Sequence, residues 1–168
     1  MQVGVISDTH DNVVAIERAV AVFEREGVDT LIHCGDFIAP PVLPFFEGFE
    51  VHGVLGNNDG ELDGLEAGFR ALGNSSELHG RLAELTLDGV RIAVLHGEST
   101  DRVEELASSG EYDLVCYGHH HERDHHDVDG CVVVNPGAHF PTVPAEHNTV
   151  AVFDTESREV TFHDVDEG

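Results

Sequence analysis

Five short polar segments of this chain place aspartate, asparagine or histidine beside glycine, and each begins where an apolar stretch ends. Glycine beside such residues lets the backbone turn sharply and approach a bound ion or phosphate. Carboxylate oxygens, an amide oxygen and imidazole nitrogens together suit manganese, iron, nickel or zinc better than calcium or magnesium. The segments are Asp8-Thr9-His10, Gly35-Asp36, Gly56-Asn57-Asn58-Asp59-Gly60, His96-Gly97 and Gly118-His119-His120-His121. Their chemistry predicts a metal centre that needs no cysteine.

None of these segments is sufficient evidence by itself. Taken alone, Asp8 with His10 favours a turn that leads into a helix, Gly35-Asp36 favours a turn, and residues 57–60 favour a loop. Ligands of open α/β sheets, however, bind outside the carboxyl ends of the strands. Because all five segments follow predicted strands, we expect their side chains to meet at one rim.

The elements that must position this rim alternate between strand and helix in the first half of the chain. Strands are predicted over residues 2–7, 30–34 and 51–55, and helices over 13–26, 41–46 and 62–72. The second half contains a predicted hairpin over 81–87 and 91–95, a helix over 100–109, and strands over 114–117, 128–129, 132–134, 149–153 and 160–163. So many strands in one domain predict two sheets with helices on their outer faces.

The composition indicates a globular protein, since 40% of the 168 residues are apolar. No apolar run approaches the roughly 20 residues of a membrane span, and the start MQVGVISDTH has no basic region of the kind found in signal peptides. We therefore expect a cytoplasmic protein without membrane contacts. Cys34, Cys116 and Cys131 each lie in or beside an apolar run, which predicts buried free thiols.

The charge is strongly acidic. Thirty-three aspartates and glutamates face eight arginines and no lysine, so the formal net charge is −25. This charge makes a nucleic-acid duplex an unlikely ligand, because its phosphates would be repelled. It also indicates a surface suited to concentrated salt, as in halophilic organisms.

The protein is therefore expected to be more stable in molar potassium chloride than in dilute buffer, because salt screens the repulsion among its carboxylates. Thermal melting at increasing potassium chloride concentration measures this. A melting temperature that does not rise would contradict the halophilic interpretation.

The ordered series of polar segments resembles the motifs of calcineurin-like metallophosphoesterases. The stretches ISDTHDN, HCGDF, GNNDGE and the late Asn135-Pro136-Gly137 further resemble the small archaeal and bacterial phosphodiesterase branch of that superfamily. The resemblance implies an α/β fold, a four-layer αββα sandwich of two mixed β-sheets flanked by helices, formed by a single domain over residues 1–168.

The resemblance also implies two divalent ions, with manganese or nickel expected first and iron or zinc as further possibilities. It assigns Asp8, His10, Asp36 and His121 to the first metal and Asp36, Asn57, His96 and His119 to the second. Asp36 would bridge the two ions, and a metal-bridging hydroxide would attack a small phosphate diester. The residues expected to take part in catalysis are Asp36, Asn57, Asn58 and His96.

Asn58 departs from the pattern, because many relatives carry histidine at this position. Asparagine donates a hydrogen bond but is no general acid near neutral pH, so aryl leaving groups are favoured. His120, His125 or His139 are alternative proton donors, and His139 is the local candidate to hold a substrate phosphate. Asp59 is expected to support the loop and a ligand histidine.

The stretch GHHHERDHH contains five histidines. His119 and His121 alternate along a chain that leaves a strand, so both are expected to face the metals while His120 points elsewhere. His125 and His126 are expected at the surface, paired with carboxylates. A metal-buffering protein would instead use these two as ligands.

Three functions therefore remain beside the diesterase: the metal-buffering protein, a non-catalytic scaffold with the metallophosphoesterase fold, and a phosphomonoesterase. The expected partner is a small phosphate ester, and assembly into a homodimer or tetramer is possible.

Overall fold

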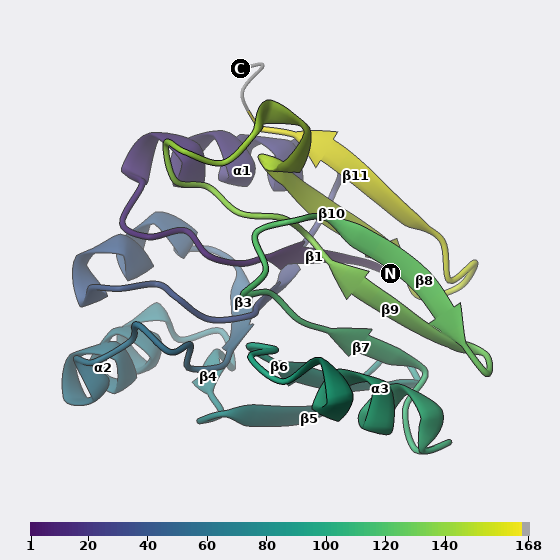
Figure 1. Cartoon of the computed structure of the whole chain (residues 1–168). Coiled ribbons are helices and arrows are strands. Elements are labelled where there is room, and N and C mark those ends of the chain that lie inside the picture. Colours follow the sequence, from purple (N-terminus) through teal and green to yellow (C-terminus); the bar gives the residue numbers. More distant parts are fainter. Residues whose placement is uncertain (166–168) are drawn as a thin grey trace.

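A computed structural model describes residues 1–165, which form two β-sheets packed face to face (Figure 1). The six-stranded sheet has the order β11-β10-β1-β2-β3-β4 and the five-stranded sheet the order β5-β6-β7-β9-β8. Their strands are β1 Gln2–Ile6, β2 Thr30–His33, β3 Glu50–Gly53, β4 Glu77–Leu78, β5 Leu82–Leu87, β6 Val90–Leu95, β7 Leu114–Cys116, β8 Asp124–Val128, β9 Cys131–Asn135, β10 Thr149–Asp154 and β11 Val160–Asp164.

Both sheets are mixed. Strands β1 to β4 run parallel to one another, while β10 and β11 join them in antiparallel fashion. In the other sheet, β6, β7 and β9 are parallel, and β5 and β8 form antiparallel edges. The carboxyl ends of the parallel strands therefore carry the loops predicted to bind metal.

Helices cover the outer face of each sheet, and α1 and α3 lie on opposite sides of the molecule (Figure 1). The six-stranded sheet is covered by α1 Val13–Arg25, the 3-10 helix η1 Pro40–Phe46 and α2 Leu62–Leu72. The five-stranded sheet is covered by α3 Thr100–Ser108. A second 3-10 helix, η2 Ala145–His147, precedes β10. The predicted four-layer αββα sandwich is confirmed.

The alternation of side chains along the strands explains the layers. On β1, Val3 and Val5 face the other sheet, while Ile6 packs under the helices. On β6, Ile92 and Val94 lie between the sheets, while Ala93 packs under α3. The strands that bury both faces are consequently apolar throughout, as is usual for parallel strands between two layers.

The start of α1 is tied to the candidate site. Asn12 caps the helix by accepting a hydrogen bond from the Ala15 amide at 3.2 Å. Its side-chain amide also donates to the carbonyl oxygen of His139, which lies in the loop after β9. One asparagine thus joins the loop after β1 to the loop after β9.

Two predicted elements differ in detail from the structure, and one short strand was missed. The predicted helix over 41–46 is a 3-10 helix, and it contains Pro44, which cannot donate an α-helical hydrogen bond. The strand predicted over 128–129 is β8, which begins at Asp124 and includes His125 and His126. As an edge strand, β8 is polar and alternates in exposure, so it has no apolar run to reveal it. The two-residue strand β4 was not predicted.

Three further predictions concern the cysteines, membrane-spanning helices and the end of the domain. Cys34, Cys116 and Cys131 are free and buried, as expected. Across residues 1–165, no helix combines the length and apolar character needed to cross a membrane. The last three positions of the predicted 1–168 domain lie outside the described residues.

Candidate metal centre

The seven predicted metal ligands gather at the carboxyl ends of strands from both sheets. The six-stranded sheet contributes Asp8 and His10 after β1, Asp36 after β2 and Asn57 after β3. The five-stranded sheet contributes His96 after β6, and His119 and His121 after β7. Backbone hydrogen bonds join these loops, because the Asp8 amide donates to the Gly35 carbonyl and the Gly118 amide donates to the His96 carbonyl.

Asp8, His10 and His121 form one group of candidate metal ligands. Oδ1 of Asp8 lies 3.3 Å from Nε2 of His121 and 3.7 Å from Nε2 of His10. Nε2 of His10 also lies 3.2 Å from Oδ2 of Asp36. The three residues can direct one ligand atom each to a common point.

Asn57, His96 and His119 form the neighbouring group. The side-chain oxygen of Asn57 lies 2.9 Å from Nε2 of His96 and 3.1 Å from Nδ1 of His119. Nε2 of His96 lies 3.5 Å from Oδ2 of Asp36. Asp36 is therefore close to histidines of both groups, where the sequence predicts a bridging ligand.

The tautomer of His96 fits a metal ligand. Its Nδ1 lies 2.8 Å from the carbonyl oxygen of Cys34, which can only accept a hydrogen bond, so Nδ1 carries the proton and donates it. The lone pair of Nε2 then faces the amide oxygen of Asn57, which is also an acceptor. Two acceptors that face each other require a cation or an additional proton between them, and such a backbone contact commonly orients a metal-binding histidine.

Two buried atoms also fit this interpretation. Within residues 1–165, Oδ1 of Asp8 and Nε2 of His10 are buried without a hydrogen-bond partner. Buried polar atoms are rarely left in this state, because each costs about 1–3 kcal/mol. A divalent ion would satisfy both atoms, so the residues present fit a bound metal.

The aspartates and histidines of the site shift one another's pKa values. Burial acts to raise the pKa of Asp8 and of Asp36, but the adjacent histidines hold the pKa of both carboxyls well below their usual range. Asp36 and Asp8 in turn raise the pKa of His10 to about 9. Burial acts to lower the pKa of His96, but the carboxylates of Asp36 and Asp8 outweigh it, so the pKa of His96 lies above its ordinary value. Without metal, protons on the histidines therefore compensate the carboxylates.

The backbone of the site is strained. Five of the seven predicted ligands, namely Asp8, His10, Asp36, His119 and His121, have φ angles between 43° and 70°. Few residues other than glycine adopt this left-handed conformation, although aspartate and histidine tolerate it better than most. Such strain clusters at functional sites, where the surrounding structure holds it in place.

Asn58 and Asp59 hold Asp36 in position. The Asn58 backbone amide and side-chain amide donate to the two Asp36 carboxylate oxygens at 3.0 and 2.8 Å. The Asp59 carboxylate accepts three backbone hydrogen bonds, from Asp36, Ile38 and Gly56, each at 2.8 Å. The sequence correctly indicated that Asp59 supports the loop, but its partners are these amides and no ligand histidine.

Gly56 is required by a close approach of two loops. A Cβ at this position would lie 2.1 Å from Oδ1 of Asp36 and 2.5 Å from its backbone nitrogen. Gly56→Ala should therefore displace Asp36 and weaken metal binding about 10- to 100-fold. Isothermal titration with manganese measures this loss.

Gly60→Ala in the same loop is the matched control, because nothing lies within 4 Å of its added Cβ. It is expected to bind manganese as the parent protein does. Equal affinities of the Gly56 and Gly60 variants would show that the close contact at Asp36 is unimportant for the metal.

Among the histidines of GHHHERDHH, His119 and His121 face the site and the others do not, as expected, but the backbone reason differs from the predicted one. His119 and His121 both turn toward the site because each has a left-handed backbone, with φ of 70° and 60°, rather than because the chain is extended. His120 is exposed, and its Nε2 lies 3.0 Å from the Gly97 carbonyl. His126 lies on β8 between Asp124 and Glu104, at 2.7 and 3.2 Å, as predicted for a surface residue.

Two proposed roles of other histidines do not agree with the structure. His139 is 1% exposed, and its Nδ1 lies 2.7 Å from the Asn148 side-chain oxygen, so it is not available to hold a substrate phosphate. His125 is exposed on β8 and is absent from both groups of candidate ligands. Of the three alternative proton donors, His120 is both exposed and beside a predicted ligand, with its ring 5.2 Å from that of His119. His139 also adjoins the site, since its backbone amide donates to the Asp8 carbonyl, but its side chain is buried.

Phe140 is a site residue that sequence reasoning missed. Its ring centroid lies 4.8 Å from that of His10 and 4.5 Å from that of His121. It thus packs against two predicted ligands from a loop more than 100 residues after β1. Only its place shortly after Asn135-Pro136-Gly137 could have marked it.

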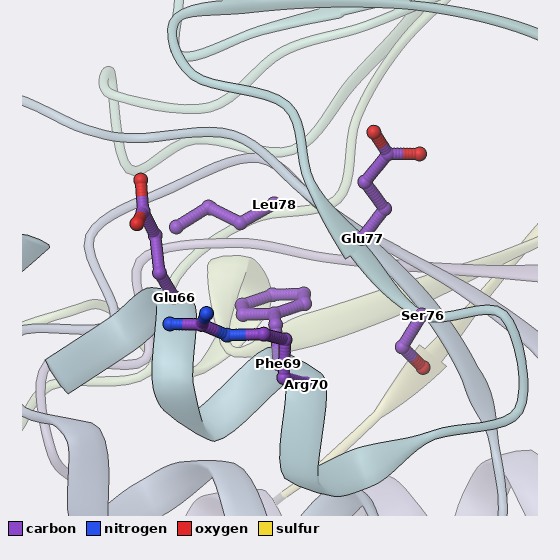
Figure 2. Close-up of a pocket in the computed structure, with 6 residues that line it drawn as sticks. All are labelled: Glu66, Phe69, Arg70, Ser76, Glu77 and Leu78. Atoms are coloured by element: carbon purple, nitrogen blue, oxygen red, sulfur yellow. The ribbon is translucent and has the colours of Figure 1, made fainter. Parts of the chain in front are cut away.

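Another hollow of the surface lies away from these groups, between α2 and β4 (Figure 2). Its cavity of about 240 Å³ is lined by Glu66, Phe69, Arg70, Ser76, Glu77 and Leu78. None of these is a predicted ligand, and the lining has more acidic than basic side chains. We therefore place the candidate site at the strand ends and not here.

The αββα sandwich brings carboxylates and histidines of both sheets to one rim, and this set of side chains fits a metal-dependent hydrolase. The family model described as the calcineurin-like phosphoesterase superfamily domain matches residues 1–158. The chain belongs to this superfamily, a family of metal-dependent hydrolases. The predicted family and enzyme class are confirmed at this level.

Individual relatives and solved structures resemble this chain over nearly its whole length. Phosphodiesterase MJ0936 of Methanocaldococcus jannaschii is 35% identical over 164 residues, which cover 95% of this chain and 96% of the relative. A solved structure described as a novel archaeal phosphodiesterase superposes with a TM-score of 0.89 at 33% identity, covering 98% of this chain and 99% of the other. The phosphoesterase YfcE of E. coli has a TM-score of 0.66 at 19% identity, covering 98% of this chain and all of the other, and shares the fold.

Proposed function

We propose that the protein is a phosphodiesterase that hydrolyses a small phosphate diester at two divalent metal ions. The observation that carries the proposal is the position of Asp36 between two groups of ligand side chains from different sheets. The names of two similar proteins support the choice of a diester, because the relative at 35% identity and the solved structure at 33% identity are both called phosphodiesterases.

In this proposal, each ion has four ligands and Asp36 is shared. Asp8, His10, Asp36 and His121 hold the first ion, and Asp36, Asn57, His96 and His119 hold the second. When bound, two such ions activate water near neutral pH and neutralise charge on the phosphate. Manganese or nickel is the expected pair, since the ligands combine imidazole with carboxylate and amide oxygens.

The residues around the ligands keep them oriented. Asn58 binds both oxygens of Asp36, and the Cys34 carbonyl fixes the proton of His96 on Nδ1. Such partners of ligands are worth about 10- to 100-fold in metal affinity or activity. Phe140 packs against His10 and His121 and limits their movement.

The chain provides no strong acid for the leaving group at position 58. Asn58 donates its amide hydrogen to Asp36 and has no proton to transfer near neutral pH. Diesters with leaving groups that depart unassisted, such as aryl esters, are therefore the preferred substrates. His120, exposed beside His119, is the remaining histidine that could assist.

Assays of aryl phosphate monoesters and diesters, with the protein purified in high salt, test the proposal. We expect hydrolysis of bis(p-nitrophenyl) phosphate, its loss with a chelator and its return with manganese or nickel. Preferential hydrolysis of the monoester would favour a phosphomonoesterase. No turnover of any ester with any metal would favour a non-catalytic scaffold.

A further inference from the structure

A second cavity adjoins the candidate metal centre on the side of His96. Its volume is about 200 Å³, and it lies between the start of β5, the end of β6 and the start of α3. Its lining includes Arg81, Leu95, His96, Glu98, Ser99 and Arg102. His96 belongs both to this lining and to the second group of ligands, so the cavity borders the candidate metal centre.

The charge of this cavity differs from that of the protein as a whole. The chain has eight arginines, no lysine and a net charge of −25, yet two of the arginines line this one cavity. Their carboxylate partners are Glu98, which also lines the cavity, and Glu105, so these four side chains carry no net formal charge. In a chain with so few cations, two guanidinium groups beside the candidate metal centre offer an anion charge-assisted hydrogen-bond donors.

The two guanidinium groups are available to a ligand. Nη1 of Arg81 lies 3.9 Å from Glu98, and Nη1 of Arg102 lies 3.0 Å from Glu105. All four side chains are at least 45% exposed. Such exposed pairs contribute about 0–1 kcal/mol, so an anion that binds the guanidiniums displaces little stabilising energy. Arginine binds phosphate through two parallel hydrogen bonds, which few other side chains can do.

We propose that Arg81 and Arg102 bind a second phosphate group of the substrate, so that the preferred substrate is a phosphodiester carrying an additional phosphate monoester. This inference rests on the proposed diesterase function. The reacting diester lies at the metal ligands, and the second phosphate occupies the cavity beyond His96. The two phosphates are thereby bound at different places, and the distal one orients the substrate without taking part in the reaction.

A matched pair of chromogenic diesters tests this inference. Thymidine 5′-(p-nitrophenyl phosphate) contains one phosphate, and its 3′-phosphorylated derivative adds the proposed second group. The kcat/KM for p-nitrophenol release is expected to be about tenfold or more higher for the 3′-phosphorylated ester at the same salt concentration. In Arg81→Gln and Arg102→Gln the ratio of the two kcat/KM values is expected to fall toward one.

Arg70→Gln is the control, because Arg70 is an exposed arginine in the hollow between α2 and β4 and should not change the ratio. Melting curves establish that the variants fold. A ratio near one in the parent protein, or a ratio that neither Arg81→Gln nor Arg102→Gln lowers, would overturn the second-phosphate site while leaving the diesterase proposal intact. No hydrolysis of either ester would overturn the diesterase proposal and this inference with it.

Discussion

Asp36→Asn is expected to lower diester hydrolysis by at least about 100-fold, the scale on which a single charge-stabilising group at a reaction centre acts. Asp36 is 1% exposed, and its Oδ2 lies 3.2 Å from His10 and 3.5 Å from His96, in the two groups of ligands. Asparagine keeps the size of the side chain and one oxygen but removes the negative charge that would lie between two dications. Initial rates with bis(p-nitrophenyl) phosphate and manganese measure the effect.

The substitution is chosen so that the backbone does not interfere. Asp36 has a φ of 59°, and asparagine tolerates this left-handed conformation as well as aspartate does. Asp129→Asn is the matched control, because Asp129 has a φ of 50° in the exposed turn between β8 and β9. It should retain full activity. Undiminished turnover in Asp36→Asn would refute a mechanism with a shared carboxylate.

Manganese or nickel is expected to raise the melting temperature of the metal-free protein by roughly 5–10 °C at 100 times the dissociation constant, since binding to the folded state alone adds about 2.7 kcal/mol at that concentration. The physical reason is local. Asp8 and Asp36 are buried carboxylates that both lie close to Nε2 of His10. A bound cation would reduce the repulsion between the two carboxylates. Differential scanning calorimetry in constant potassium chloride measures the shift.

The metal effect should depend on pH. Asp36 and Asp8 raise the pKa of His10 to about 9, and His10 must lose this proton before it can bind a metal. The apparent affinity should therefore rise by up to about tenfold per pH unit for each displaced proton until about pH 9, and then level off. In the metal-free protein the same interaction stabilises the fold fully below the ordinary pKa of 6.5, and this contribution is lost as the pH rises through 9.

Two histidines of the same run provide the comparison. His121→Ala should lose most of the metal-induced shift, because Nε2 of His121 lies 3.3 Å from Asp8. His125→Ala should keep it, since His125 is exposed on β8 and is not among the candidate ligands. A shift that survives His121→Ala but disappears in His125→Ala would place the metal on β8 and support the metal-buffering protein instead.

The sequence by itself determined the architecture and the positions of the candidate ligands. Short apolar runs and capping by Asn12 are local signals, and they correctly placed most strands and α1. Asp8, Asp36 and His96 follow such strands directly, so the rule that ligands gather at carboxyl strand ends was sufficient to bring them together.

Only the tertiary structure decided how these residues are held and what surrounds them. The edge strand β8 depends on its pairing with β9, so its polar residues gave no local signal. Phe140 and Asp59 act through contacts made by distant loops, and the left-handed backbone of Asp36 exists because those contacts over-determine it. The cavity lined by Arg81 and Arg102 likewise brings together the residue before β5 and a residue of α3, which lie 21 positions apart in the chain and have no local signal in common.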